Sequence, residues 1–287
     1  MKTIDLHVHS AFSDGTFSPE EIIDLAIKKG LSAFALTDHD TVSGIDAALQ
    51  YAQQINAPLQ VIPGIEISAE HHKKEIHIVG LYINHHDTHF IREIEVFAER
   101  RLHRNEEMAA RFQKAGIPMT IEDLQEGNPD TIITRAHFAR YLISHHVVKD
   151  AKEAFSDYLG EDSPFYVPRA RIAATEAICL ILQNGGIPVL AHPIHYHMTE
   201  SDLRKMIAEF KENGLVGIEV KYSNHTTQDE VFVRRLSQEF QLLPSGGSDF
   251  HGGNKPDIDL GTGRGNLTIP YEYLEQFRSW HDKHNTF

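Results

Sequence analysis

The stretch TIDLHVHS, residues 3–10, predicts the first strand of the fold and the first part of a functional site. Residues 3–8 have the short, β-rich pattern of a buried strand, and the strand ends on His7 and His9. Side chains two residues apart on an extended chain point to the same side, so we expect both imidazoles to face one place. A helix is predicted to follow, because Ser18-Pro19-Glu20-Glu21 combines an N-cap, a first-turn proline and a capping box.

This alternation of strand and helix recurs along the chain. Further strands are predicted at residues 33–36, 60–67, 75–82, 187–191, 217–221 and 241–245. Seven strands alternating with helices predict an α/β fold in which parallel strands form a closed or nearly closed barrel. The connection between the fourth and fifth strands is far longer than an ordinary crossover and is mainly helical in pattern. We therefore predict a helical subdomain inserted at residues 100–170, between barrel segments 1–99 and 171–287.

Composition excludes several classes of protein. The chain has 287 residues with 41 Asp+Glu against 27 Lys+Arg, a formal charge of −14, which argues against a broad nucleic-acid-binding face. Its single cysteine, Cys179, excludes an intrachain disulfide framework and a cysteine-built zinc site. No apolar run approaches the roughly 20 residues of a membrane span, and the start lacks an apolar signal segment. We expect a cytoplasmic protein without a membrane partner.

Histidines and carboxylates gather at the predicted strand ends. In an α/β barrel these ends converge on one mouth, so the side chains are expected to meet there. Crowded carboxylates repel one another, and divalent cations relieve that repulsion. Nitrogen and oxygen ligands without thiolate suit Zn, Mn or Fe, and nine ligands are enough for two to three ions. The residues are His7, His9, Asp14, His39, Glu66, His77, His192, Asp249 and His251; His77 is the exception in lying near the start of its strand.

The same residues carry a family resemblance. The motifs DLHVHS (5–10), SDG (13–15), TDHD (37–40), GIEIS (64–68), HIVG (77–80), AHP (191–193) and GSDFH (247–251) resemble the PHP (polymerase and histidinol phosphatase) family, and most of all its stand-alone nucleotide-phosphatase branch. The resemblance covers nearly all of the chain outside the helical insertion. It implies a distorted seven-stranded (β/α)7 TIM-like barrel and a trinuclear site.

The resemblance also implies how the ligands are grouped. One metal ion would be held by His7, His9, Glu66 and Asp249. A second would be held by Glu66, His77 and His192, with Glu66 bridging the two ions. A third would be held by Asp14, His39 and His251.

The expected activity is hydrolysis of a phosphate monoester of a nucleotide, either a 5′-AMP-like compound or a 3′,5′-bisphosphate. Bound metals would lower the pKa of a water and so supply a hydroxide nucleophile. Arg135 is the expected catalytic, phosphate-binding cation, because the related branch has an arginine in a similar segment. His225, after the sixth strand, is predicted to bind the phosphate or protonate the leaving group. Asp40, beside His39, is a candidate catalytic residue that orients an imidazole N–H group.

Three alternatives remain open at the level of sequence. The first is a 5′→3′ exonuclease on short RNA or DNA oligonucleotides, which the lack of an obvious basic stripe disfavours. Arg100, Arg101 and Arg104 could form an RNA-facing patch, but acidic residues lie nearby and we expect an exposed, salt-bridged helix face instead. The second is a histidinol-phosphate phosphatase, which the long insertion disfavours. The third is a non-catalytic metal-binding regulatory module, which the complete ligand set disfavours. The expected partner is a small phosphorylated substrate, and no obligate protein partner is implied.

Overall fold

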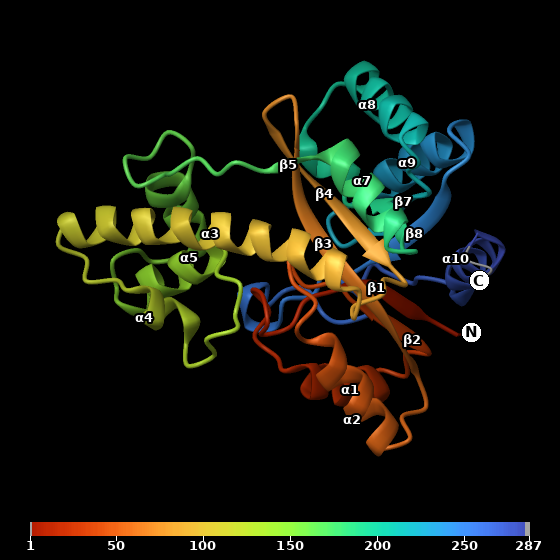
Figure 1. Ribbon diagram of the computed structural model, residues 1–287, viewed down its shortest axis with the longest axis horizontal. Coiled ribbons are helices and arrows are strands. Elements are labelled where there is room, and N and C mark those ends of the chain that lie inside the picture. The colour runs from red at the N-terminus through yellow and green to blue at the C-terminus, as the bar shows by residue number, and fades with distance from the viewer. Residues whose placement is uncertain (1, 285–287) are drawn as a thin grey trace.

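The computed structural model describes residues 2–284 and shows a nearly closed, barrel-shaped sheet (Figure 1). The strand order is β1-β2-β3-β4-β6-β7-β8, and the short β5 pairs with β3. This arrangement confirms the predicted seven-stranded barrel. The strands are β1 (Ile4–Val8), β2 (Ala33–Leu36), β3 (Gln60–His71), β4 (Lys74–Leu81), β5 (Ile172–Ala173), β6 (Ile187–Leu190), β7 (Gly217–Tyr222) and β8 (Leu243–Gly247).

Helices cover the barrel and extend from one side of it. In Figure 1, α1 and α2 lie together on one side of the sheet, α7, α8 and α9 lie on another, and the long α3 projects away toward α4 and α5. None of the helices within residues 2–284 is both long and apolar enough to cross a membrane. The helices and helical turns are α1 (Pro19–Lys28), α2 (Ile45–Gln54), α3 (Thr88–Lys114), α4 (Ile121–Gln125), α5 (Arg135–Ser144), α6 (Ala151–Glu153), η1 (Ala154–Leu159), α7 (Ala174–Gln183), η2 (Pro193–Tyr196), α8 (Glu200–Glu212), α9 (Thr227–Glu239), η3 (Gly252–Asn254) and α10 (Tyr271–His284).

The expectation that all strands are parallel is wrong at β4. This strand runs antiparallel to both β3 and β6, while the other neighbouring pairs on the barrel path are parallel. The cause is a two-residue hairpin at His72 and Lys73, whose φ angles of 48° and 66° match the type I′ turn that joins adjacent antiparallel strands. Because β4 is reversed, its first residues lie beside the last residues of β3, where Ser68 pairs with His77. His77 therefore reaches the same end of the barrel as the residues that follow the parallel strands.

The barrel is joined between β1 and the segment after β8. The His9 N–H donates to the Phe250 carbonyl at 3.0 Å, and the Asp249 N–H donates to the His7 carbonyl at 2.9 Å. Gly247 permits this close approach, because a Cβ atom there would lie 2.1 Å from the Cβ of His7. The register of β1 against β2 also shifts between Asp5 and Val8, which is the signature of a β-bulge.

The core is divided between the barrel interior and two helical layers. Ile4, Ala35 and Val189 belong to an interior cluster that Phe277 of α10 closes at the end where the strands begin. Alternate strand residues such as Phe34 pack outward in the cluster that contains α1 and α7. This alternation is the two-residue period of strands buried on both faces.

The helices around α5 have a separate apolar cluster. Phe112 of α3, Phe138 and Leu142 of α5, and Leu159 of η1 are all fully buried in it. The helix α3 links this cluster to the barrel, since its first half places Phe90 against the barrel helices. It runs without a break through residue 100, and the division of the chain into residues 1–99, 100–170 and 171–287 stays a prediction.

We expect the buried His137 to make stability depend on pH. Its Nδ1 accepts a 3.0 Å hydrogen bond from the Thr134 N–H at the start of α5, and burial lowers its pKa to about 4. The unfolded chain takes up a proton on this ring near pH 6.5 and the folded chain does not, so stability is lost as the pH falls from about 6.5 toward 4. The difference in urea unfolding free energy between wild type and His137→Gln should therefore shrink by on the order of 3 kcal/mol across this range. A difference that is constant with pH would contradict the assignment.

Candidate metal centre and adjoining basic pocket

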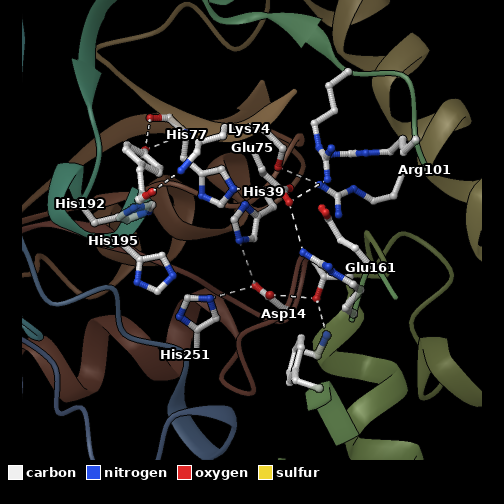
Figure 2. A pocket seen from close by; sticks show the side chains of 18 of the residues that line it. Asp14, His39, Lys74, Glu75, His77, Arg101, Glu161, His192, His195 and His251 are labelled. Atoms are coloured by element: carbon white, nitrogen blue, oxygen red, sulfur yellow. Dashed lines mark hydrogen bonds and ion pairs between the residues drawn. The ribbon is translucent and has the colours of Figure 1, made fainter. Parts of the chain in front are cut away.

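The mouth of the barrel collects side chains from six strands or strand ends and from the loop after β1. The loop after β1 is held in place by Asp38, whose Oδ1 accepts hydrogen bonds from the Ser10 N–H at 2.8 Å and from the Ser13 hydroxyl at 2.5 Å. This brace places Asp14, and the Thr134 hydroxyl donates to its Oδ2 at 2.9 Å. Figure 2 shows His39, His77, His192 and His251 converging with Asp14 on one space.

Glu66 is the centre of the cluster. Its two carboxylate oxygens lie within 3.3 Å of imidazole nitrogens from five histidines, at 3.2 Å from His7 Nε2 and 2.9 Å from His77 Nδ1, for example. Glu66 itself is 1% exposed. The five histidines are His7, His9, His39, His77 and His192.

The remaining predicted ligands adjoin this centre. Asp249 Oδ1 lies 3.4 Å from His9 Nε2 and 3.3 Å from His251 Nδ1. Asp14 Oδ1 lies 3.1 Å from His251 Nε2 and 3.8 Å from His39 Nε2. The structure thus brings all nine predicted ligand residues into one connected group.

Compact subsets of this group have the geometry of cation sites. Ligand atoms lie within 4.8 Å of one another in the sets His9–Asp14–His39–His251, His7–His9–Glu66 and His39–Glu66–His77. The first set contains the three residues that the family resemblance assigns to one ion, with His9 in addition. The third differs from the implied set in having His39 where the resemblance places His192, although His192 Nε2 is 3.1 Å from Glu66 Oε1.

Several buried polar atoms of the group have no hydrogen-bond partner within residues 2–284. They include Nε2 of His7, both ring nitrogens of His9, Oδ1 of Asp14, Nδ1 of His39 and Nδ1 of His192. Buried polar atoms without a partner are costly and uncommon in folded proteins. A divalent cation is the group that imidazole nitrogens and carboxylate oxygens can bind together, so this donor set fits a metal centre.

The pKa values of the cluster are shifted in both directions, some above and some below their ordinary values. Burial disfavours the charged form of His9, but the carboxylates of Glu66 and Asp249, 3.3 and 3.4 Å from its Nε2, outweigh burial and raise its pKa to about 9. Burial lowers the pKa of the adjacent His39 to about 3. Burial likewise opposes ionisation of Asp14, but the neighbouring imidazoles hold its pKa well below the usual range. Protons and cations therefore compete for the same atoms, and acidification is expected to release metal.

The backbone is also strained at the mouth. His192 has φ 26° and Asp249 has φ 57°, although neither is a glycine. Each such residue costs on the order of 1–3 kcal/mol and persists only where its surroundings hold it. Asp249 is held by its Oδ2, which accepts hydrogen bonds from the Tyr222 hydroxyl at 2.9 Å and from Lys255 Nζ at 2.6 Å.

Glu219 of β7 is a buried acid that sequence reasoning missed. Its carboxylate lies 3.2 Å from His7 Nδ1 and accepts the His192 N–H at 2.7 Å. The residue is 2% exposed. A signal existed in the charged residue within the apolar strand GIEVKY, but only the fold shows which residues it meets.

The prediction of a catalytic Asp40 gains no support from its placement. Asp40 is 1% exposed, and its Oδ2 accepts from Arg169 at 3.1 Å and from Arg101. Its Oδ1 accepts the Ser68 N–H at 2.8 Å. Burial opposes its ionisation, yet the two guanidinium groups hold its pKa below the ordinary value. Asp40 thus anchors two arginines, and within residues 2–284 no contact with a histidine ring supports its predicted role in orienting an imidazole N–H group.

These arginines belong to a basic pocket beside the metal-ligand cluster. The pocket has a volume of about 520 Å³ and contains eight lysine or arginine side chains against three carboxylates. Arg135 is among them, and its Nη2 lies 3.2 Å from Glu75 Oε2, which also binds Arg171 at 2.7 Å. The basic residues are Lys73, Lys74, Arg101, Arg104, Arg135, Arg169, Arg171 and Lys255, and the acidic ones are Asp14, Glu75 and Glu161.

The expectation of an exposed arginine face on α3 is wrong for two of its three members. Arg101 and Arg104 are each 5% exposed and line the pocket, whereas Arg100 is exposed. The signal was present in the spacing, because Arg101 and Arg104 continue the helical stripe that runs from Phe97 to Met108. Nearby acidic residues masked it, since they suggested surface pairing.

His225 lies away from the pocket. Its Nδ1 bonds to the Val220 carbonyl at 3.0 Å, and its ring packs against Tyr222 with centroids 5.3 Å apart. It is absent from the residues that line the pocket within the described chain. Its predicted role in phosphate binding therefore gains no support from its position.

Comparisons with known proteins agree with this site. The family model described as "PHP domain" matches residues 5–161, more than half of the chain. The chain is 37% identical over 250 residues to a 5′-3′ exoribonuclease from Haemophilus influenzae, covering 87% of this chain and 90% of that protein. It is 34% identical to a 3′,5′-nucleoside bisphosphate phosphatase from Chromobacterium violaceum, covering 91% of each.

A solved structure shares the whole fold. A protein from Bifidobacterium adolescentis, assigned as a metal-dependent phosphoesterase, superposes with a TM-score of 0.85 at 28% identity. The match covers 100% of this chain and 97% of that one. The fold is thus shared over the full length.

We expect His192→Ala to weaken metal binding. The substitution removes an imidazole that lies 3.1 Å from Glu66. Loss of even an outer contact to a metal ligand costs about 10–100-fold in affinity, so loss of a ligand should cost at least that. Inductively coupled plasma mass spectrometry of dialysed protein should show fewer ions per chain than wild type. His195→Ala is the control, because His195 lines the same pocket without contacting a carboxylate of the cluster; equal metal content in all three proteins would contradict the ligand role.

We expect Asp40→Asn to destabilise the fold. The asparagine tolerates the positive φ of 52° but leaves the buried Arg101 and Arg169 without a counter-ion. Breaking a buried ion pair on one side costs about 3–5 kcal/mol. Urea unfolding should show this loss, with the exposed Asp24→Asn as control. Wild-type stability combined with loss of turnover would instead restore the catalytic reading of Asp40.

Proposed function

This chain belongs to the PHP domain family and is a hydrolase of phosphate esters that depends on metal ions, and on that premise we propose that it removes one phosphate from a 3′,5′-bisphosphate nucleotide. The proposed metal ligands are the nine residues of the cluster at the barrel mouth. Two to three divalent ions, Zn, Mn or Fe, would bind there. They would supply Lewis-acid charge and a water of lowered pKa, which is the chemistry that phosphomonoester hydrolysis needs.

The surroundings of Arg104 are the observation that favours a doubly phosphorylated substrate. Arg104 is 5% exposed, lines the pocket, and makes no hydrogen bond or ion pair to any residue within 2–284. Burial, together with the charges of the neighbouring Arg101 and Arg169, lowers its pKa to about 8. A buried cation among other cations is costly unless an anion meets it. A second phosphate of the substrate would supply that anion.

The helical segment would provide most of this second phosphate site. Arg101, Arg104, Arg135 and Arg169 all lie within residues 100–170, which we propose act as a cap over the barrel mouth. A guanidinium has the planar fork that binds two phosphate oxygens at once. The phosphate at the metal centre would be cleaved, and the phosphate at the arginines would hold the nucleotide in register.

The surroundings of Arg135 support the proposal that it binds phosphate. Arg135 lines the pocket, and its guanidinium lies 6.0 Å from the ring centre of Tyr166 and beside Glu75. Because Glu75 also binds Arg171, the three groups carry a net positive charge. We propose that Arg135 binds oxygens of the scissile phosphate and stabilises the charge that develops on them.

A second candidate function is 5′→3′ exonuclease activity on short oligonucleotides. The Haemophilus influenzae relative named for that activity is 37% identical, so the same architecture serves it. Lys73 and Lys74, at the β3–β4 turn, extend the basic lining of the pocket and could contact a further phosphate. Both functions would use the same metal-ligand cluster and the same basic pocket, and they differ in the length of the substrate. The cytoplasmic location stays a prediction.

A substrate panel tests the proposal directly. Metal-loaded protein should hydrolyse a 3′,5′-bisphosphate nucleotide with higher kcat/KM than the matching nucleoside monophosphate, and release one phosphate per molecule. A 5′-phosphorylated trinucleotide, assayed at two salt concentrations, measures the second candidate. Higher kcat/KM on the trinucleotide would replace the first function by the second. Equal kcat/KM on the mono- and bisphosphates would show that the protein does not recognise the second phosphate.

We expect Arg104→Met to reduce selectivity for the second phosphate. Methionine keeps the aliphatic volume and removes the charge, so a charge-assisted contact of about 1.5–3 kcal/mol is lost. The kcat/KM for the bisphosphate should fall by about 10–100-fold, while that for the monophosphate changes little. Arg100→Met is the matched control, since Arg100 lies on the same helix and is exposed. Equal losses on both substrates would contradict the assignment.

A further inference from the structure

We propose that Glu219 is a positioning residue that sets two metal ligands at once, the ring of His7 and the backbone of His192. The inference rests on the proposed metal ligation by these two histidines, and it holds for either candidate substrate. Glu219 lies on β7, between the β1 end that carries His7 and the β6 end that carries His192. It is not among the residues that line the basic pocket, so it would act on the ligands from the side facing away from that pocket.

The carboxylate of Glu219 is divided between the two histidines. Its Oε1 lies 3.2 Å from Nδ1 of His7, and its Oε2 accepts the backbone N–H of His192 at 2.7 Å. The side chain is 3% exposed, and within residues 2–284 its one ion-pair partner is His7. No lysine or arginine competes for its oxygens there. Both acceptor atoms are therefore committed to the two ligand residues.

The contact with His7 determines which ring nitrogen faces the cluster. A carboxylate only accepts hydrogen bonds, so the facing Nδ1 must carry a proton. An imidazole that binds a cation through Nε2 keeps its remaining proton on Nδ1, which is the form that Glu219 selects. His7 Nε2 has no hydrogen-bond partner among the described residues and lies 3.2 Å from Glu66 Oε1 and 3.8 Å from Asp249 Oδ1. It is therefore presented to the centre of the cluster.

The contact with His192 holds a strained backbone. His192 has φ 26° and ψ 59° and is followed by Pro193, which disfavours helical conformations in the residue before it. The short hydrogen bond from its N–H to Glu219 opposes relaxation of that strain. With the backbone held, His192 Nε2 stays 3.1 Å from Glu66 Oε1, while Nδ1 is buried and has no partner in the part of the chain that the structure describes.

Two β-bulges bring Glu219 and His7 together. The register of β1 shifts between Asp5 and Val8, and the register of β7 shifts between Glu219 and Lys221. The β1 bulge lets the consecutive residues Leu6 and His7 both reach the interior, where Leu6 joins the apolar cluster and His7 meets Glu219. Bulges redirect side chains at functional sites, and here each of them adjoins one partner of the same contact.

Glu219→Gln is the sharpest test, because it keeps the shape and removes the charge. A glutamine offers one acceptor and one donor group, so it cannot accept from both the His7 ring and the His192 N–H. We expect binding of Zn²⁺, measured against a competing chelator, to weaken by about 10–100-fold. Glu219→Asp keeps the carboxylate and should recover part of that affinity. Glu230→Gln is the control, since Glu230 contacts β7 through Lys221 at 3.1 Å without contacting a histidine.

Nuclear magnetic resonance separates positioning from general stability. In Zn²⁺-loaded wild type, we expect a slowly exchanging Nδ1–H proton on His7 and a metal-bound Nε2. This proton should exchange faster in Glu219→Gln than in Glu230→Gln. The wild-type spectrum is sufficient if Glu219→Gln does not fold, because a His7 ring that binds zinc through Nδ1 would overturn the proposal. Unchanged zinc affinity and unchanged exchange in folded Glu219→Gln would also overturn it, and the substrate assays would stand unaffected.

Discussion

The burial of one carboxylate, Glu66, among five imidazoles is the constraint on which the rest of the structure depends. Glu66 is 1% exposed and lies within 3.3 Å of nitrogens from histidines on four different strands or strand ends. Such an arrangement is stable only when cations or protons balance it. The reversed β4, the bulged β1 and the strained His192 each bring one histidine to this centre. The irregular features of the barrel thus share one geometric cause.

The local charge of the mouth differs from that of the whole molecule. The chain carries a formal charge of −14, yet the pocket beside the cluster holds eight basic side chains against three acidic ones. Net charge governs long-range encounter, while binding is governed by the field inside the pocket, where burial reduces screening. An acidic protein can therefore bind a phosphorylated substrate.

The helical segment is tied to the barrel by several contacts near the site. The Ile132 N–H donates to the Phe12 carbonyl at 2.9 Å, and the Thr131 hydroxyl donates to the Ala11 carbonyl at 2.8 Å. These bonds, with those of Asp40 to Arg101 and of Thr134 to Asp14, join the loop that carries a proposed ligand to the helices that carry the arginines. These contacts fix the position of the arginines relative to the proposed metal ligands.

The sequence by itself determined the barrel class and the chemistry of its mouth. Strand patterns, helix caps such as Ser18 and the spacing of His7 and His9 are local, and local geometry decides which side a residue faces. Tertiary structure alone decided the burial of Arg101 and Arg104 and the contacts of Asp40 and Glu219. A buried charge looks the same in sequence as a solvated one, because its partner lies elsewhere in the chain. Asp40 is 61 residues from Arg101 and Glu219 is 212 from His7, so only the folded chain shows which pairs form.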